Sequence, residues 1–425
     1  MRTQQWQRLD TAAKIYPPST TKKNTMVFRL VCELTESVDK DILQHALDIS
    51  LETSPFYRSV LRHGLFWYYL ETSDIKAEVH EESSTPCTQI YDENRHGLLF
   101  SLTYYRKRIN LEMFHALADA DGALNFLKSI LHHYLIEKYK DELSKNNIRV
   151  LKNCKPPDQK STDAFDTYYS KEKAPKQEKS RRSYCMKGER FPEERFGIIE
   201  GHVSTDALLN KCHELNATVS ELLVSLVIWS FKGSMKRVEE IHPVAVQVPI
   251  NLRKYFRSNT ERNFLGFFDA SHNYSTQGKT FDDVLNSIKN TFKNHLTPAN
   301  LQGQLNWSTS LDHAAYIKIV PLPLKSVVMK NVVSFKNTKT SATFSNIGSI
   351  DMPSELQSYV RLFSIYCSVK QLYVGVCTFG GITSISFTSP YINPGVQRTF
   401  FRTLSEYGID VELVANTQEL SGDDA

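Results

Sequence analysis

Residues 114–127, with the sequence FHALADADGALNFL, constrain the fold of this chain most, because a strand must end and a helix must begin within them. Apolar residues alternate with more polar ones over 108–114, which predicts a β-strand. Apolar residues then recur at helical spacing from 124 to 135, so a helix is predicted to begin near Asp121. His115 therefore lies at the C-terminal end of a strand, where open α/β folds usually place their reactive groups.

His115 is followed four residues later by Asp119, and this pair suits proton-transfer chemistry. An imidazole titrates near neutral pH, so His115 is a candidate general base. A nearby carboxylate such as Asp119 can fix the tautomer of that imidazole or hold its loop in shape. On spacing alone, a hydrogen-bonded structural histidine is the more common outcome, since HxxxD occurs by chance in many chains.

The segment from His115 to Asp119 resembles the HxxxDG signature of the CoA-dependent acyltransferase superfamily, which includes chloramphenicol acetyltransferase and peptide-synthetase condensation domains. It most resembles the bacterial alcohol acetyltransferase-like branch, whose motif is similar to FHALxDGxGAxxFL. Further blocks extend the resemblance over nearly the whole chain. They are WQRLDTAAKIYP at 6–17, PINLRKYF at 249–256, NFLGF at 263–267 and TFSNIG at 343–348.

The resemblance implies a fold and a set of site residues. The fold is α/β, an α+β sandwich of two pseudo-symmetric chloramphenicol-acetyltransferase-like domains with an active-site tunnel between them. His115 and Asp119 would be the catalytic pair, and Arg253 would support the site as the ionic partner of Asp119. Phe264 and Phe267 would line a substrate channel, although core packing is the usual role of such aromatic runs.

Two more residues are tentative substrate-binding candidates by the same resemblance. Ser345 and Asn346 resemble the late turn that supplies a polar donor near the reacting carbonyl. The chain departs from the motif where alanine, Ala120, replaces the glycine expected after Asp119, and Gly122 follows as the expected support of the turn. Alanine reaches positive φ poorly, so this departure bears on the local turn and on activity.

Composition and charge exclude several classes of function. The chain has 425 residues, enough for two domains, and its net charge of +4 gives no electrostatic reason to expect nucleic acid. The N-terminus lacks the apolar core of a signal peptide and no stretch is long enough to span a membrane, so we expect a cytoplasmic protein. We also expect a monomer. The seven cysteines never show CxxC spacing, which predicts reduced, mostly buried thiols and no metal site.

Strand and helix patterns recur in both halves of the chain. We expect an N-terminal acyltransferase half at 1–152 with the HxxxD motif, a linker at 153–194, and a C-terminal half at 195–425. Residues 171–190 of the linker carry eight Lys or Arg against three Glu. This basic run could attract the phosphates of a nucleotide-bearing donor, although a solvated linker is the more common outcome. In the C-terminal half, Thr218 to Glu221 has the capping-box pattern of a helix start.

The resulting hypothesis is an acyltransferase that moves an acyl group, acetyl or short acyl, from acyl-CoA to a small alcohol or amine. Acetyl-CoA would be a co-substrate and no cofactor would stay bound. Ala120 motivates an alternative, a catalytically weakened protein of the same fold that binds an acyl or carrier ligand. A condensation-type enzyme that takes its thioester from a carrier protein is the third possibility.

Overall fold

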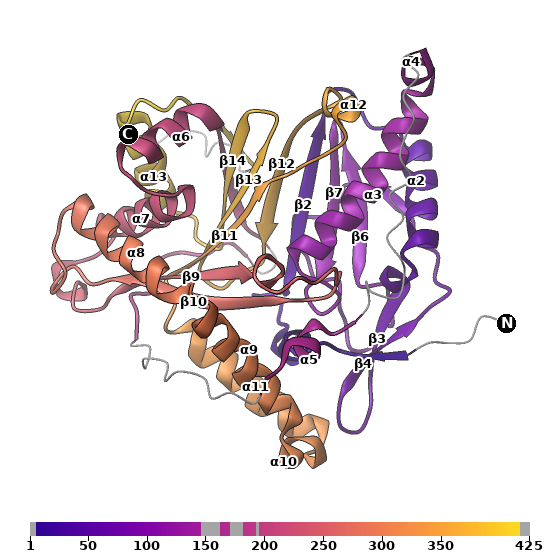
Figure 1. Cartoon of the computed structure of the whole chain (residues 1–425), viewed down its shortest axis with the longest axis horizontal. Coiled ribbons are helices and arrows are strands. Elements are labelled where there is room, and N and C mark those ends of the chain that lie inside the picture. The colour runs from indigo at the N-terminus through magenta and orange to yellow at the C-terminus, as the bar shows by residue number, and fades with distance from the viewer. Residues whose placement is uncertain (1–5, 146–161, 171–181, 193–194, 417–425) are drawn as a thin grey trace.

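The computed structural model describes residues 6–145, 162–170, 182–192 and 195–416 (Figure 1). Two large sheets lie next to each other, and helices cover their outer faces. A smaller three-stranded sheet lies at the base of the N-terminal half. The predicted fold class, a mixed architecture of two sandwich-like halves, is confirmed.

The sheet of the N-terminal half is built around β2 (Val27–Leu34) and β7 (Arg108–Phe114). These two strands are antiparallel, with Val27 opposite Phe114 at the end that carries the HxxxD motif. Both strands are almost wholly buried, and Arg29 of β2 and Glu112 of β7 form an ion pair of 2.9 Å between them. The five strands are ordered β12 (Val360–Cys367), β2, β7, β6 (Phe100–Tyr105) and β5 (Val79–Glu81).

Two helices cover this sheet, α2 (Lys40–Thr53) and α3 (Ala120–Lys138), and they pack against each other. Each begins at an aspartate N-cap, Asp39 for α2 and Asp119 for α3. The side-chain oxygen of such a residue accepts hydrogen bonds from the first free N–H groups of the helix. The helix predicted near Asp121 thus begins one residue earlier, because Asp119 caps it.

The sheet of the C-terminal half has seven strands. Its strand β11 is parallel to both of its neighbours, whereas the outer strands are antiparallel. The order is β10 (Leu265–His272), β9 (Val244–Asn251), β11 (Ala342–Ser349), β13 (Leu372–Phe379), β14 (Ile382–Ser389), β8 (Gly197–Ser204) and β15 (Val411–Ala415). The small sheet has the order β1 (Trp6–Arg8), β4 (Tyr68–Thr72) and β3 (Ser59–His63).

Helix α7 (Val219–Lys232) is the most apolar helix on the C-terminal sheet, and most of its side chains are buried. Thr218 and Glu221 form the predicted capping box at its start. The remaining helices of this half include α6 (Thr205–Glu214), α8 (Phe281–His295) and α13 (Gly395–Glu406). Short helices elsewhere are α1 (Tyr16–Ser19), α4 (Lys140–Lys145), α5 (Ala164–Tyr168) and α12 (Ser354–Gln357).

Strand β12 connects the two halves. It follows β11 of the C-terminal sheet in sequence, but it lies beside β2 at the edge of the N-terminal sheet. The chain then returns through residues 368–371 to β13 in the other sheet. Much of the predicted linker lies outside the described residues. The division into 1–152, 153–194 and 195–425 therefore stays a prediction.

Three helices project from the base of the C-terminal half (Figure 1). They are α9 (Pro298–His313), α10 (Ala315–Ile319) and α11 (Leu322–Asn337), and the sequence patterns did not predict them. In the described part of the chain, no single helix is long and apolar enough to cross a membrane. Helices α6 and α7 reach that length and composition only as a pair, and the pair is bent by 84°.

Candidate active site

A cavity of about 150 Å³ lies where the two halves of the molecule meet. The N-terminal half contributes α1, β2 and the junction between β7 and α3. The C-terminal half contributes β9, β10, β11 and the chain from β12 to β13. His115, Asp119 and Arg253 all line this cavity, so residues far apart in sequence come together in one place.

His115 extends β7 by one residue at the edge of the cavity. Its backbone N–H donates to the carbonyl oxygen of Met26 at 2.9 Å, which continues the β2–β7 pairing. Its imidazole lies between two aromatic rings, stacked on Tyr16 at 4.8 Å and tilted against Phe28 at 4.6 Å between ring centroids. Burial lowers the pKa of His115 to about 4, against a smaller opposing effect of Asp119. At neutral pH the imidazole is therefore uncharged and able to accept a proton.

A chain of buried polar groups holds the backbone of His115. The Asn263 side-chain amide donates to the carbonyl oxygen of His115 at 3.0 Å and to the Asp10 carboxylate at 3.2 Å. Asp10 also accepts from the N–H of Ala13 at 2.7 Å, next to α1. Nδ1 of His115 and Oδ1 of Asn263 are both buried without a well-formed hydrogen bond among the described residues. The N-terminal opening block and the NFLGF block thus position the same histidine.

Asp119 is buried and does not act as the hydrogen-bonding partner of His115 in this structure. Its carboxylate binds the guanidinium of Arg253 through two contacts of 2.8 and 3.1 Å. The same oxygens accept the backbone N–H groups of Gly122 at 3.0 Å and Phe264 at 2.9 Å. One side chain therefore caps α3, pairs with an arginine and fixes a loop of the other half.

Arg253 lies just after β9 and is almost wholly enclosed. Its guanidinium also donates to the backbone carbonyls of Thr260, at 2.9 Å, and Arg262. A second carboxylate, Asp121, lies 3.5 Å from its Nε. Burial disfavours the charged form, but the two carboxylates outweigh it and raise the pKa of Arg253. The contact that the sequence predicted between Asp119 and Arg253 is present, and it ties the two halves together.

The glycine that this junction needs is Gly122. A Cβ atom there would lie 1.9 Å from the backbone oxygen of Glu261, so any side chain would push the two halves apart. Ala120 is the first residue of α3 and has no positive φ, so its position does not require glycine. The backbone oxygen of Gly122 accepts the hydroxyl of Tyr57 at 2.8 Å.

The candidate substrate-binding residues divide into two groups. Phe267, Ser345 and Asn346 line the cavity, whereas Phe264 is absent from the described residues that do so. Phe264 is fully buried and packs against Phe165 and other rings of the core, so its expected place in a channel is corrected. Its backbone N–H is the group that serves the site, through Asp119.

Asn346 takes part in a local bulge of β11. Its amide donates to the Ser220 hydroxyl at 3.0 Å, and its side-chain oxygen accepts from Gly348 at 2.8 Å. Gly348 has a φ of 86°, which suits glycine alone among common residues. The glycine of the TFSNIG block is thus explained by the backbone turn beside the cavity.

The sequence interpretation gave no role to several residues that line the cavity. Tyr16 and Phe28 enclose the imidazole, and Cys367 and Tyr373 come from the chain around the β12–β13 connection. Burial raises the pKa of the Cys367 thiol to about 12, so a thiolate is disfavoured. Tyr16 lies within the quoted N-terminal block, which was the one available signal. Cys367 belongs to six described cysteines, all of them free thiols.

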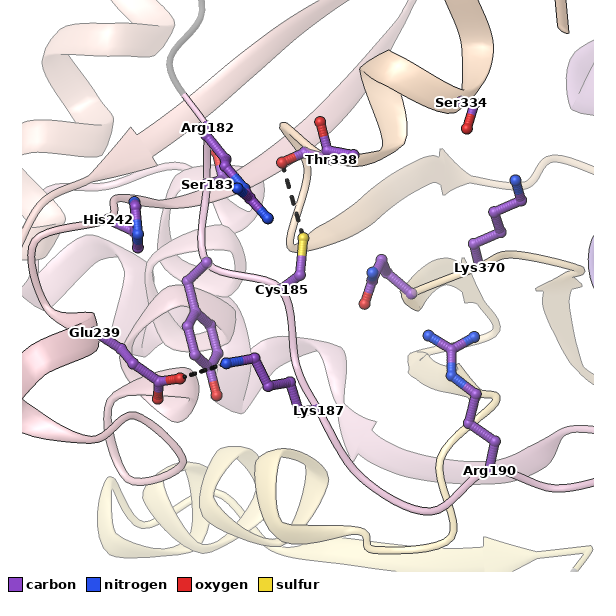
Figure 2. A pocket seen from close by; sticks show the side chains of 12 residues that line it. Arg182, Ser183, Cys185, Lys187, Arg190, Glu239, His242, Ser334, Thr338 and Lys370 are labelled. Atoms are coloured by element: carbon purple, nitrogen blue, oxygen red, sulfur yellow. Dashed lines mark hydrogen bonds and ion pairs between the residues drawn. The ribbon is translucent and has the colours of Figure 1, made fainter. Parts of the chain in front are cut away.

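A second, more open pocket of about 470 Å³ lies on the other side of the β12–β13 connection (Figure 2). Val369 lines the cavity beside His115, while its neighbours Lys370 and Gln371 line this second pocket. We call it the basic pocket, because its walls carry Arg182, Lys187, Arg190 and Lys370. Figure 2 shows Lys370 and Arg190 on one side and Arg182 and Lys187 on the other.

Of the four cations that line the basic pocket, Lys187 alone forms an ion pair with a carboxylate among the described residues. Lys187 pairs with Glu239 at 3.1 Å, whereas Arg190 stacks over the ring of Tyr391 at 4.5 Å. Burial, Lys330 and Arg190 together lower the pKa of Lys370. Among the described residues, no ion pair with a carboxylate is present for Arg182, Arg190 or Lys370. Across that same part of the chain, no group of His, Cys, Asp and Glu side chains could hold a metal ion.

No family model matches the chain, and no curated protein matches it. Several solved structures, in contrast, are similar to the chain. TRI3 trichothecene 15-O-acetyltransferase from Fusarium sporotrichioides is similar over 95% of this chain and 94% of its own, with a TM-score of 0.64 and 11% identity. F. graminearum TRI101, crystallised with coenzyme A and T-2 mycotoxin, is similar over 96% and 99%, with a TM-score of 0.63 and 9% identity.

A condensation domain has a comparable structure. The first condensation domain of the calcium-dependent antibiotic synthetase, in complex with a substrate analogue, is similar over 96% of this chain and 99% of its own. The TM-score is 0.59 and the identity 12%. These likenesses show that the chain has the fold that TRI3, TRI101 and this condensation domain share.

Proposed function

We propose that this protein transfers an acyl group from acyl-CoA to a small alcohol or amine. The observation that carries the proposal is an uncharged, partly buried imidazole, His115, that lines a cavity between the two halves. Acyl transfer needs a base for the proton of the acceptor, and an uncharged imidazole supplies one. The fold shared with an acetyltransferase and with a protein crystallised with coenzyme A supports this reaction class.

In the proposed reaction, His115 accepts the proton of the acceptor hydroxyl or amine while its oxygen or nitrogen attacks the thioester carbonyl. The tetrahedral adduct then breaks its carbon–sulfur bond, and the leaving sulfur takes the proton back from the imidazolium. An ester or amide and free CoA thiol result. Positioning the two substrates contributes much of the rate, and the general base contributes roughly 10²–10⁴-fold.

Direct transfer is favoured over an acyl-enzyme intermediate. Cys367 is the cysteine that lines the cavity, and its raised pKa keeps it as a thiol. A thiol is a poor nucleophile compared with a thiolate. We therefore expect that no cysteine carries the acyl group, and that mass spectrometry during turnover finds none acylated.

The basic pocket supports a phosphate-bearing donor. Guanidinium and ammonium groups bind phosphate oxygens by charge-assisted hydrogen bonds, and Arg182, Arg190 and Lys370 have no competing carboxylate among the described residues. The β12–β13 connection contributes to both this pocket and the catalytic cavity. A thioester in the cavity and the phosphates of the same donor in the basic pocket would thus lie on two sides of one turn.

The small, largely apolar cavity favours a short acyl group and a small acceptor. Side chains such as Phe28, Leu265 and Ile365 form its walls beside the polar groups of the site. The test is release of CoA thiol from a set of acyl-CoAs, each with a panel of alcohols and amines. Turnover that needs both substrates supports the proposal, and thiol release that is equal without acceptor contradicts it.

The condensation domain among the similar structures supports a second candidate, transfer from a thioester on a carrier protein. A carrier presents the same pantetheine arm with a single phosphate. Transfer from a phosphopantetheinyl carrier, with none from acyl-CoA, would favour that reading. The weakened-enzyme alternative has less support, since Ala120 has ordinary helical geometry and the tight contact falls on Gly122.

A further inference from the structure

Helix α11 presents an apolar face to solvent. It packs on α1 through the side that carries Leu322 and Lys325, both buried. The opposite side carries apolar side chains spaced three or four residues apart, between 51% and 62% exposed. A surface helix normally shows polar groups on that side. We call these residues the α11 face: Leu324, Val327, Val328, Val332 and Phe335.

Neighbouring segments extend this surface. The hairpin between β3 and β4 ends in Leu65, which is 70% exposed, and its carbonyl oxygen accepts the N–H of Leu322 at 2.9 Å. The Lys325 ammonium donates to the carbonyl oxygen of Phe66 at 3.0 Å. Ile319 of α10, just before α11, is 73% exposed. Contiguous exposed apolar surface of this kind marks an interaction site on a protein that must stay in solution.

The charge of the segment has one sign. No Asp or Glu occurs from residue 313 to residue 350. Lysines occur in the same stretch at Lys318, Lys325, Lys330, Lys336 and Lys339. The ammonium of Lys339 lies 4.4 Å from the ring of Phe335, at the end of the α11 face. The exposed aliphatic and aromatic groups thus share a stretch of sequence that has no carboxylate side chain and includes the exposed Lys318 and Lys330.

We propose that the α11 face binds the surface of a membrane that contains anionic lipids. An interfacial helix of this type places Leu, Val and Phe side chains among the acyl chains while lysines contact the headgroups. Anionic headgroups attract nearby lysines by about 1 kcal/mol each. The inference concerns binding to a surface and does not depend on the proposed reaction.

A second copy of this chain fits the face less well. Symmetric dimers usually pair the same patch on both subunits, so the lysines near the α11 face of one copy would lie close to those of the other copy. Like charges that face each other across an interface cost free energy. An anionic lipid surface would bury the apolar residues and also neutralise the positive charge of the lysines.

The experiment is sedimentation of the full chain with phosphatidylcholine vesicles, with and without phosphatidylserine. We expect binding to the phosphatidylserine vesicles that weakens with salt. Val328→Asp should lower the partition coefficient by about tenfold or more, because it places a carboxylate in the apolar contact. The matched control is Val238→Asp, since Val238 is 74% exposed but lies outside the α11 face.

Both aspartate variants are at exposed positions, and equal melting temperatures check that they fold. Lys318→Glu keeps the apolar face and should lower the partition coefficient about fivefold or more. Failure to bind phosphatidylserine vesicles at low salt would overturn the proposal, as would equal losses in the two aspartate variants. A dimer in light scattering that only Val328→Asp dissociates, without vesicle binding, would assign the face to a second copy instead.

Discussion

The cavity beside His115 and the basic pocket lie on two sides of the same turn, yet their charged side chains differ in whether they have partners. In the cavity wall, Arg253 is enclosed by Asp119, Asp121 and two backbone carbonyls. In the basic pocket, Arg182, Arg190 and Lys370 have no carboxylate partner in the described part of the chain. Paired buried charges fix a structure, whereas unpaired exposed cations remain available to a ligand. The comparison predicts that substitutions in the Asp119–Arg253 pair alter folding and chemistry together, and substitutions in the basic pocket alter binding alone.

The largest effect is expected for His115→Ala. Removal of the proton acceptor should lower turnover by at least about 10²-fold, because general-base assistance contributes 10²–10⁴-fold. The substitution leaves the Asp119–Arg253 pair in place, so the melting temperature should change little. Steady-state rates near those of the parent protein would refute the assignment of the base.

Next come the single substitutions Asp119→Ala and Arg253→Ala. Each leaves a buried charge without its partner, which costs about 3–5 kcal/mol of folding free energy. The double substitution should cost clearly less than the sum, since both charges are then gone. Denaturant unfolding of the four proteins measures the coupling, and strict additivity would show that the pair contributes nothing as a pair.

In the basic pocket, Arg190→Ala and Lys370→Ala should each raise the KM for acyl-CoA about tenfold and leave kcat unchanged. The reason is that a hydrogen bond to a charged group contributes about 1.5–3 kcal/mol. An acyl-pantetheine donor without phosphates is the matched control, and its kinetics should not respond. Equal increases for both donors would mean that the pocket acts on the cavity and not on phosphate.

The pH dependence follows from the lowered pKa of His115, about 4 against an ordinary 6.5. The imidazole stays uncharged well below neutrality, so kcat/KM at pH 5 should lie within about twofold of its plateau. Between these pKa values the unfolded chain binds a proton that the folded chain does not, so stability falls as pH falls through this window. An acid limb of kcat/KM centred near pH 6.5 would contradict the buried, neutral imidazole.

The smallest effect is expected for Ala120→Gly. The backbone at Ala120 has no positive φ, so glycine gains nothing there and costs about 0.5–1 kcal/mol through added unfolded-state entropy. Thermal melting measures this loss. Gly122→Ala is the contrasting variant, and it should destabilise far more because its Cβ would meet the Glu261 carbonyl. Higher activity and stability in Ala120→Gly would restore the expectation of a glycine-dependent turn at that residue.

Local patterns predicted those elements whose stability is decided by nearby residues. The strand before His115, the helix after Asp119 and the capping box at Thr218 all follow from periodicity and capping chemistry. Helices α9 to α11 did not follow from such patterns, since the apolar residues of α11 point to solvent. Phe264 was misplaced for a related reason, because aromatic residues in a row do not reveal which of them meets a cavity.

By itself, the sequence determined the strand-end position of His115, through its periodicity. The resemblance carried by its motif blocks implied the two-half fold and the pairing of Asp119 with Arg253. Only the tertiary structure decided that Tyr16 and Phe28 enclose the imidazole, that β12 crosses between sheets and that Lys370 and Arg190 share one pocket with Arg182. Each of these contacts joins segments far apart in sequence, and burial, which sets the pKa of His115, exists only once those segments have packed.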